Sequence, residues 1–250
     1  MEVLFLIQSC NEERYIKEEQ ILRETYLKRL RKGCCYYFYR GNGNNTLSGD
    51  TLLLDCEDDL NHTFKKTMMA LSVFKNKGYD FIVRLNTSNW INMELLFNLL
   101  ETLNSSKREL IGGKALKNGT TKGIPILRGN LLIINKTIMN DLFESTKKKY
   151  DSGIDDVLIG LNLFSYYKEI GVEYLNVLKN ISYKAYSDIT NITNKDIENT
   201  ICIRLVDKIK KDGNSEVIRE IDNRYIQSKL EKCCLEKIKY VETYHGDKEL

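Results

Sequence analysis

The sequence has little proline and histidine, and it has no long apolar run. Its 250 residues include one proline, Pro125, and two histidines, His62 and His245. No cysteines have the spacing of zinc ligands, so a zinc site is not expected. No stretch is long enough to span a membrane, and residues 1–7 lack the basic start of a signal peptide. We therefore expect a cytoplasmic protein without a membrane span.

The balanced charge and the absence of common nucleotide-binding motifs argue against further classes of protein. Lys and Arg number 38 against 35 Asp and Glu, a net charge of +3, which is too balanced to predict binding to nucleic acid. GxGxxG and P-loop motifs are absent, which argues against an unrelated α/β nucleotide-binding protein. The seven cysteines, an odd number without a secretory signal, suit reduced thiols.

Apolar patterns alternate between those of strands and those of helices. Strands are predicted at residues 3–8, 35–39, 51–54, 81–85, 110–111, 126–134 and 200–206. Helices are predicted from residue 11 to about 30, and at 58–77, 93–103, 135–143, 155–167 and 215–235. This alternation is typical of an α/β fold with a mixed, Rossmann-type sheet flanked by helices and followed by a helical tail.

The most informative segment is residues 81–96. An apolar strand that contains Arg84 runs into Asn86-Thr87-Ser88, then Asn89-Trp90-Ile91-Asn92, then Leu95-Leu96. This segment resembles the region of the β-1,3-galactosyltransferase and fringe family of GT-A glycosyltransferases in which three aspartates bind a metal. Asn, Thr and Ser stand here in place of those aspartates. Hard divalent cations prefer anionic oxygen ligands, so the metal site that the resemblance implies is degenerate.

Three further segments resemble the same family and occur in the same order. They are Gln20 to Tyr26, with Arg23 and Thr25 matching; Gly49 to Asp55, continuing through Asp58 to Lys66-Thr67; and Ser152 to Val157, ending at Gly160. Together the four segments span roughly residues 3 to 165. The rest of the chain shows no clear resemblance.

The resemblance implies an inverting transferase with a single GT-A-like domain over residues 1–250. Such an enzyme moves a sugar from a nucleotide-sugar donor, of the UDP type, to a hydroxyl of a glycan or glycoconjugate. Residues 3–92 would be the nucleotide-binding half, residues 93–200 the acceptor half, and residues 201–250 a C-terminal strand and basic helix. The alternative is a catalytically inactive sugar- or nucleotide-binding module of the same fold.

The resemblance also assigns roles to particular residues. Asp156 would be the base that deprotonates the acceptor, with Asp155 beside it, although two carboxylates at a helix start also have a plain role as caps. The donor-binding candidates are Ser9, Cys10, Arg23, Asp55, Lys66, Arg84, Asn86 and Ser88. The candidates for the acceptor and sugar pocket are Trp90, Arg128, Gly129 and Asn130. We expect Ser9, Cys10, Arg23 and Asn86 to line a cleft at the carboxyl ends of the strands.

Three possibilities remain open for the missing metal carboxylates. Mn²⁺ or Mg²⁺ could bind weakly through Asn86 and Ser88. Basic side chains could replace the ion, the candidates being Arg84, Lys114, Arg128 and Arg204. Turnover could instead be lost while ligand binding remains. Residues 86–88 could also be an ordinary turn with Ser88 or Asn89 as the cap of the next helix, which is compatible with all three.

Overall fold

The computed structural model describes residues 1–113, 115–116, 123–127, 131–146, 153–186, 191–205, 208–209 and 215–216. Within these residues, the centre of the molecule is an eight-stranded mixed sheet with the order β11-β7-β10-β5-β1-β2-β4-β3. Its strands are β1 (Val3–Gln8), β2 (Cys34–Arg40), β3 (Thr46–Ser48), β4 (Thr51–Leu53), β5 (Phe81–Asn86), β7 (Leu110–Gly112), β10 (Leu131–Asn135) and β11 (Leu178–Asn180). The protein is therefore an α/β protein with a mixed sheet, as predicted.

Parallel pairing at the centre of the sheet aligns the ends of β1, β2 and β5. β1 pairs in parallel with both β2 and β5, and Gln8 lies beside Tyr39 on one side and Asn86 on the other. The loops that follow these strands therefore meet at one edge, which we call the carboxyl edge. β10 is antiparallel to β5 and makes the sheet mixed.

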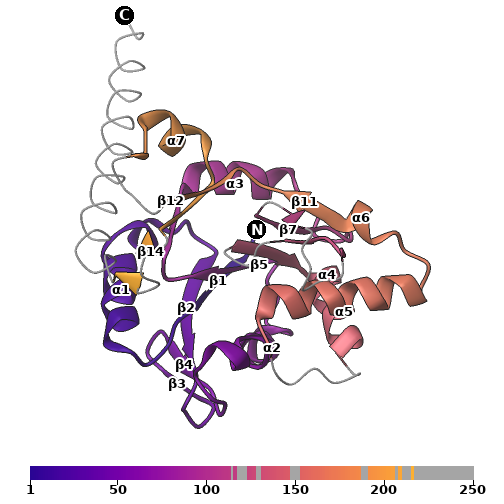
Figure 1. Cartoon of the computed structure of the whole chain (residues 1–250), viewed down its shortest axis with the longest axis horizontal. Coiled ribbons are helices and arrows are strands. Elements are labelled where there is room, and N and C mark those ends of the chain that lie inside the picture. Colours follow the sequence, from indigo (N-terminus) through magenta and orange to yellow (C-terminus); the bar gives the residue numbers. More distant parts are fainter. Residues whose placement is uncertain are drawn as a thin grey trace, which may run out of the picture.

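Helices cover both faces of this sheet. The helices of the described residues are α1 (Glu13–Glu24), α2 (Thr63–Phe74), α3 (Met93–Thr102), α4 (Lys136–Ser145), α5 (Asp155–Glu169), α6 (Tyr174–Val177) and α7 (Asn194–Asn199), of which α1 and α3 cover one face and α2, α4 and α5 the other. Alternate β1 residues such as Phe5 pack with α1 and α3, whereas Leu4 and Leu6 pack with α2, α4 and α5. Figure 1 shows β1, β5 and β7 between α3 on one side and α4 and α5 on the other. Because both faces are covered, β1 is buried along nearly its whole length.

A smaller sheet joins distant parts of the chain. It consists of β12 (Tyr183–Tyr186), β13 (Cys202–Leu205) and β6 (Asn89–Ile91), in the order β12-β13-β6. β13 is antiparallel to β6, so Ile203 lies beside Trp90 and Arg204 beside Asn89. Two short pairs complete the strands: β8 (Ala115–Leu116) with β9 (Ile126–Leu127), and β14 (Lys208–Ile209) with β15 (Ser215–Glu216).

Several predicted boundaries were wrong. The first helix ends at Glu24, because Thr25 leaves helical backbone angles and residues Tyr26–Arg29 form a 3₁₀ helix. The second begins at Thr63 after a 3₁₀ turn, Leu60–His62. β3, β6, β8, β11, β12, β14, α6 and α7 were missed, and within the range predicted as one strand, 126–134, the described residues form β9 and β10. Ser215–Glu216 is a strand rather than a helix start, and the rest of the predicted basic helix lies outside the described residues. In the described part of the chain, no helix combines the length and apolarity that crossing a membrane needs.

Candidate active site

The carboxyl edge brings together residues that follow β1 and β5. Ser9 comes directly after β1, and Asn86 is the last residue of β5, in register with Gln8. Ser9 Oγ and Asn86 Oδ1 are buried, and neither has a hydrogen-bond partner among the described residues. Leaving a buried polar atom unpaired costs about 1–3 kcal/mol, so such atoms mark places where a ligand or water would bind. The half-buried Cys10 follows, and burial raises the pKa of its thiol.

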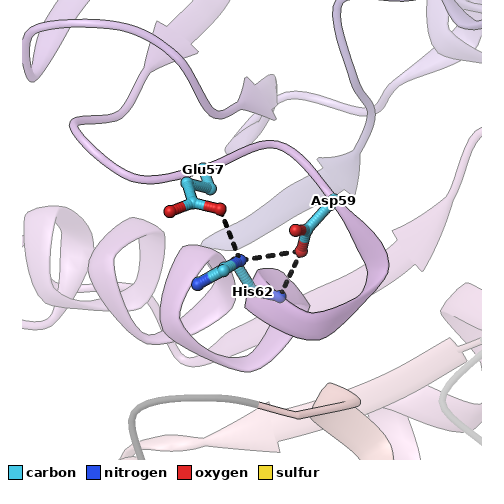
Figure 2. A group of neighbouring side chains, drawn as sticks. All are labelled: Glu57, Asp59 and His62. Atoms are coloured by element: carbon cyan, nitrogen blue, oxygen red, sulfur yellow. Dashed lines mark hydrogen bonds and ion pairs between the residues drawn. The ribbon is translucent and has the colours of Figure 1, made fainter.

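A short acidic loop leaves the same edge after β4. Glu57, Asp59 and His62 converge there, with donor atoms within 4.8 Å of one another (Figure 2). Asp59 Oδ1 also accepts the backbone N–H of His62 at 2.9 Å and so caps the 3₁₀ turn. Asp55, a predicted donor-binding residue, is an exposed residue earlier in this loop.

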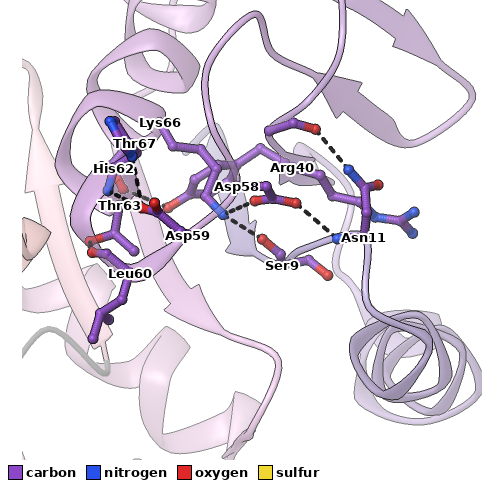
Figure 3. Close-up of polar contacts among 12 residues, drawn as sticks. Ser9, Asn11, Arg40, Asp58, Asp59, Leu60, His62, Thr63, Lys66 and Thr67 are labelled. Atoms are coloured by element: carbon purple, nitrogen blue, oxygen red, sulfur yellow. Dashed lines mark hydrogen bonds and ion pairs between the residues drawn. The ribbon is translucent and has the colours of Figure 1, made fainter.

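Lys66 joins this loop to the loop after β1, as Figure 3 shows. Its Nζ donates to the carbonyl of Ser9 at 2.7 Å and to Asp58 Oδ1 at 2.5 Å. The other Asp58 oxygen accepts the backbone N–H of Asn11 at 2.8 Å. The side chains of Lys66 and Asp58 are 3% and 4% exposed. The predicted donor-binding lysine thus lies at the carboxyl edge, with its ammonium group already ion-paired.

Arg84 lies inside the molecule, on the sheet face that α2 and α5 cover. It forms an ion pair with Asp155, and its Nε donates to the Tyr39 hydroxyl at 3.2 Å. The Thr67 hydroxyl donates to Asp155 Oδ2 at 3.1 Å and lies 2.9 Å from the Tyr39 hydroxyl. Burial opposes the guanidinium charge, but the Asp155 carboxylate and the Tyr39 oxygen outweigh it and raise the pKa of Arg84. Arg84 is therefore held as a cation within this network.

Asp155 also orients its neighbour at the start of α5. Its Oδ1 accepts the backbone N–H of Asp156 at 2.9 Å, while its own N–H donates to the Thr63 hydroxyl at 3.2 Å. Asp155 is 4% exposed, whereas Asp156 is less buried and its Oδ1 accepts the N–H of Val157 at 2.8 Å. Of the two carboxylates, Asp155 is the internal anchor and Asp156 is the one nearer solvent.

Arg23 lies beside the amino end of β4 rather than at a carboxyl end. It donates two hydrogen bonds to Asp50, at 2.7 and 2.8 Å, and one to Glu19 at 3.1 Å. Its guanidinium lies 4.4 Å from the centre of the Phe38 ring. The hydrogen bond to Asp50 raises the pKa of Arg23 and lowers that of Asp50. Of the four residues expected to line one cleft, Ser9, Cys10 and Asn86 lie at the same edge and Arg23 is in this separate ion-pair cluster.

The turn at residues 86–88 packs against α1. The Thr87 hydroxyl donates to the buried carboxylate of Glu18, a residue that the sequence analysis did not single out. A charged residue among the apolar positions of α1 was the available signal. The turn itself offers neutral oxygens, so it does not fit the anionic ligand set of Mn²⁺ or Mg²⁺. Ser88 is 3% exposed.

The residues that follow this turn form the start of α3 and part of the buried interior. The cap of α3 is Asn92, whose side chain accepts the N–H of Leu95 at 3.2 Å, so the expectation of a Ser88 or Asn89 cap was wrong. Trp90 is 1% exposed, and its indole Nε1 has no hydrogen-bond partner among the described residues. Lys114, Arg128, Gly129 and Asn130 lie outside the described residues.

Comparison with known proteins finds similar solved structures only. No family model matches, and no curated protein matches in sequence. Glycosyltransferase GlyE of Streptococcus pneumoniae is 13% identical with a TM-score of 0.45, over 95% of this chain and 64% of its own. Galactosyltransferase LgtC, solved with donor and acceptor sugar analogues, is 12% identical with a TM-score of 0.48, over 93% of this chain and 95% of its own. The bifunctional glycosyltransferase WbbM is 11% identical with a TM-score of 0.45, over 91% of this chain and 52% of its own. At these values the likeness carries no conclusion about activity.

Proposed function

We propose that this protein is a glycosyltransferase of the GT-A type, which transfers a sugar from a UDP-type nucleotide donor to a hydroxyl of a glycan or glycoconjugate. The observation that carries the proposal is the carboxyl edge, where the unpaired polar atoms of Ser9 and Asn86 follow neighbouring parallel strands. Open α/β sheets bind their ligands at this edge. The four segments that resemble β-1,3-glycosyltransferases support the choice of chemistry.

The start of α5 supports a role for Asp156 as general base. The backbone N–H of Asp156 donates to Asp155, and Asp155 forms an ion pair with Arg84 in the centre of the sheet. A base must be held in position to remove the acceptor proton while the hydroxyl oxygen attacks the anomeric carbon and the diphosphate leaves from the opposite face. In this proposal Asp156 accepts that proton and the sugar is transferred with inversion. Asp155 and Arg84 position the base without touching the acceptor.

One observation favours the alternative of an inactive binding module. The departing diphosphate needs positive charge, yet Arg84 is paired with Asp155 and Lys66 with Asp58. Of the other basic residues that could replace the metal ion, Lys114 and Arg128 lie outside the described residues, and Arg204 lies on β13 next to Asn89. Binding without transfer is therefore the second candidate function.

A thermal-shift panel of UDP, GDP and their sugars, with and without Mn²⁺, tests the binding that both functions require. We expect UDP-type ligands to raise Tm, since ligand that binds only the folded state stabilises it. Ser9→Ala should lower this ligand shift without lowering the Tm of the free protein, because the Ser9 hydroxyl is buried and has no hydrogen-bond partner among the described residues.

The matched control for Ser9→Ala is Ser72→Ala on the exposed side of α2, which should keep the full ligand shift. No shift with any nucleotide would reject both functions. A shift without transfer or hydrolysis of any donor would leave the binding module.

A further inference from the structure

The loop between β4 and α2 contains three metal-ligating side chains that no step above uses. His62 Nδ1 lies 2.7 Å from Asp59 Oδ1 and 3.5 Å from Glu57 Oε2. Figure 2 shows both carboxylates directed at this one nitrogen. Among the described residues this is the one group of three or more His, Cys, Asp and Glu side chains that could hold a metal ion. The imidazole distinguishes it from an ordinary acidic surface patch.

The residue between the two carboxylates fixes the loop. The Asp58 side chain is 4% exposed and is held by Lys66 and by the N–H of Asn11, as Figure 3 shows. Glu57 and Asp59, on either side of it, are exposed. Because the backbone is anchored at Asp58 and again at the 3₁₀ turn, the ligands are partly ordered before any ion binds. Such ordering lowers the entropy cost of binding.

The spacing of the donor atoms suits a first-row cation. Ligands about 2.0–2.2 Å from one ion lie roughly 3 Å apart, which is close to the 2.7 and 3.5 Å separations observed. One imidazole and two carboxylates suit Zn²⁺ or Mn²⁺ better than Mg²⁺, which prefers oxygen ligands alone.

We propose that Glu57, Asp59 and His62 form a binding site for a divalent transition-metal ion, Zn²⁺ or Mn²⁺. Three protein ligands leave at least one coordination position open, as in zinc sites that also bind water or substrate. The loop is hydrogen-bonded to the segment before α5, where the Gly153 N–H donates to the Asn61 carbonyl, and Phe64 N–H at the start of α2 donates to the Gly153 carbonyl at 3.1 Å. The site is thus tied to the segment that carries Asp155 and Asp156. Ion binding does not depend on the proposed sugar transfer.

Isothermal titration of the nucleotide-free full chain with Zn²⁺ and with Mn²⁺, near pH 7.5, tests the site. We expect the wild type to bind one Zn²⁺ or Mn²⁺ ion saturably and to bind Mg²⁺ more weakly. His62→Gln and Asp59→Asn should each weaken that binding by about 10-fold or more, as the loss of ligand support typically does. Asn at position 59 keeps an oxygen for the cap, so the loop should still fold, which circular dichroism checks.

Matched controls separate this site from other metal-binding groups. His245→Gln removes the other histidine of the sequence, and Glu94→Gln removes an exposed carboxylate from α3. Both should bind the ion as the wild type does. The absence of saturable binding by the wild type would overturn the proposal. Equal affinity of His62→Gln and wild type would do the same by placing the ion elsewhere.

Discussion

Arg84 on β5 and Asp155 in the first turn of α5 form an ion pair in which the side chains are 1% and 6% exposed. Taking two charges out of water is costly, so the pair is favourable only because further hydrogen bonds satisfy both groups. Tyr39 accepts from Arg84, and Thr67 donates to Asp155. The network therefore links β2, β5, α2 and α5 and fixes where the start of α5 lies.

Breaking this pair from one side should destabilise the fold strongly. Arg84→Met leaves the Asp155 carboxylate buried without its cation, and we expect a loss of about 3–5 kcal/mol in the free energy of unfolding. Urea unfolding followed by circular dichroism measures it. The double variant Arg84→Met/Asp155→Leu should recover much of the loss, since it leaves neither charge buried alone.

Arg31→Met is the control for this cycle. Arg31 pairs with Glu101 at 2.9 Å at the surface, where both side chains are about half exposed. Surface pairs contribute about 0–1 kcal/mol, so this variant should be nearly as stable as the wild type. Similar losses for Arg84→Met and Arg31→Met would contradict the importance of the buried pair.

The buried Lys66 allows a second test of stability, because the exposed Lys65 beside it serves as a matched control. Lys66→Met removes the partner of Asp58 and of the Ser9 carbonyl, so we expect a loss of a few kcal/mol and earlier proteolysis of the loop after β1. Lys65→Met changes the same residue type on the exposed side of α2 and should leave stability within about 0.5 kcal/mol. Urea unfolding and limited proteolysis of the two variants, side by side, decide the point.

The Arg23–Asp50 pair predicts a pH dependence. Its hydrogen bonds lower the pKa of Asp50 in the folded state, so its contribution is complete above the unfolded pKa of about 3.9 and is lost as pH falls through the folded value. Between pH 6 and pH 3, wild type should therefore lose more stability than Asp50→Asn, by about 1 kcal/mol or less because both side chains are partly exposed. Urea unfolding at the two pH values measures this. Parallel losses in the two proteins would show that the pair contributes little.

Much of the sheet could be predicted because its central strands are buried on both faces. The apolar run at residues 3–7 led to a predicted strand 3–8, which is β1 to the residue, and β5 was predicted one residue short. The short β3 was missed because its residues Thr46–Ser48 are exposed and show no apolar pattern. The end of α1 at Thr25 also has no strong breaker in the sequence, since Tyr26 and Leu30 continue the apolar spacing.

The candidate site could be predicted only in part, because tertiary pairing decides what each charged residue contacts. Arg84 and Asp155 were both singled out, but their pairing joins residues far apart in the sequence and no local pattern indicates it. Asp155 was considered as a possible cap, whereas its side chain is mainly an internal ion-pair partner. Glu18 was missed because its contact with Thr87 likewise depends on how α1 packs against the sheet.

Asp156 is the residue on which the proposed chemistry depends. Asp156→Asn keeps the size of the side chain and an oxygen that can accept the Val157 N–H, so the fold should persist. If Asp156 is the base, transfer should fall by about 10²-fold or more, which general-base catalysis commonly contributes. The affinity for UDP should barely change, because the base acts on the acceptor. Steady-state kinetics with an accepted donor, and calorimetry with UDP, measure the two effects separately.

Asp155→Asn is the contrasting variant, because its first effect should be a loss of stability through Arg84. Wild-type kinetics in Asp156→Asn would show that this carboxylate is not the base.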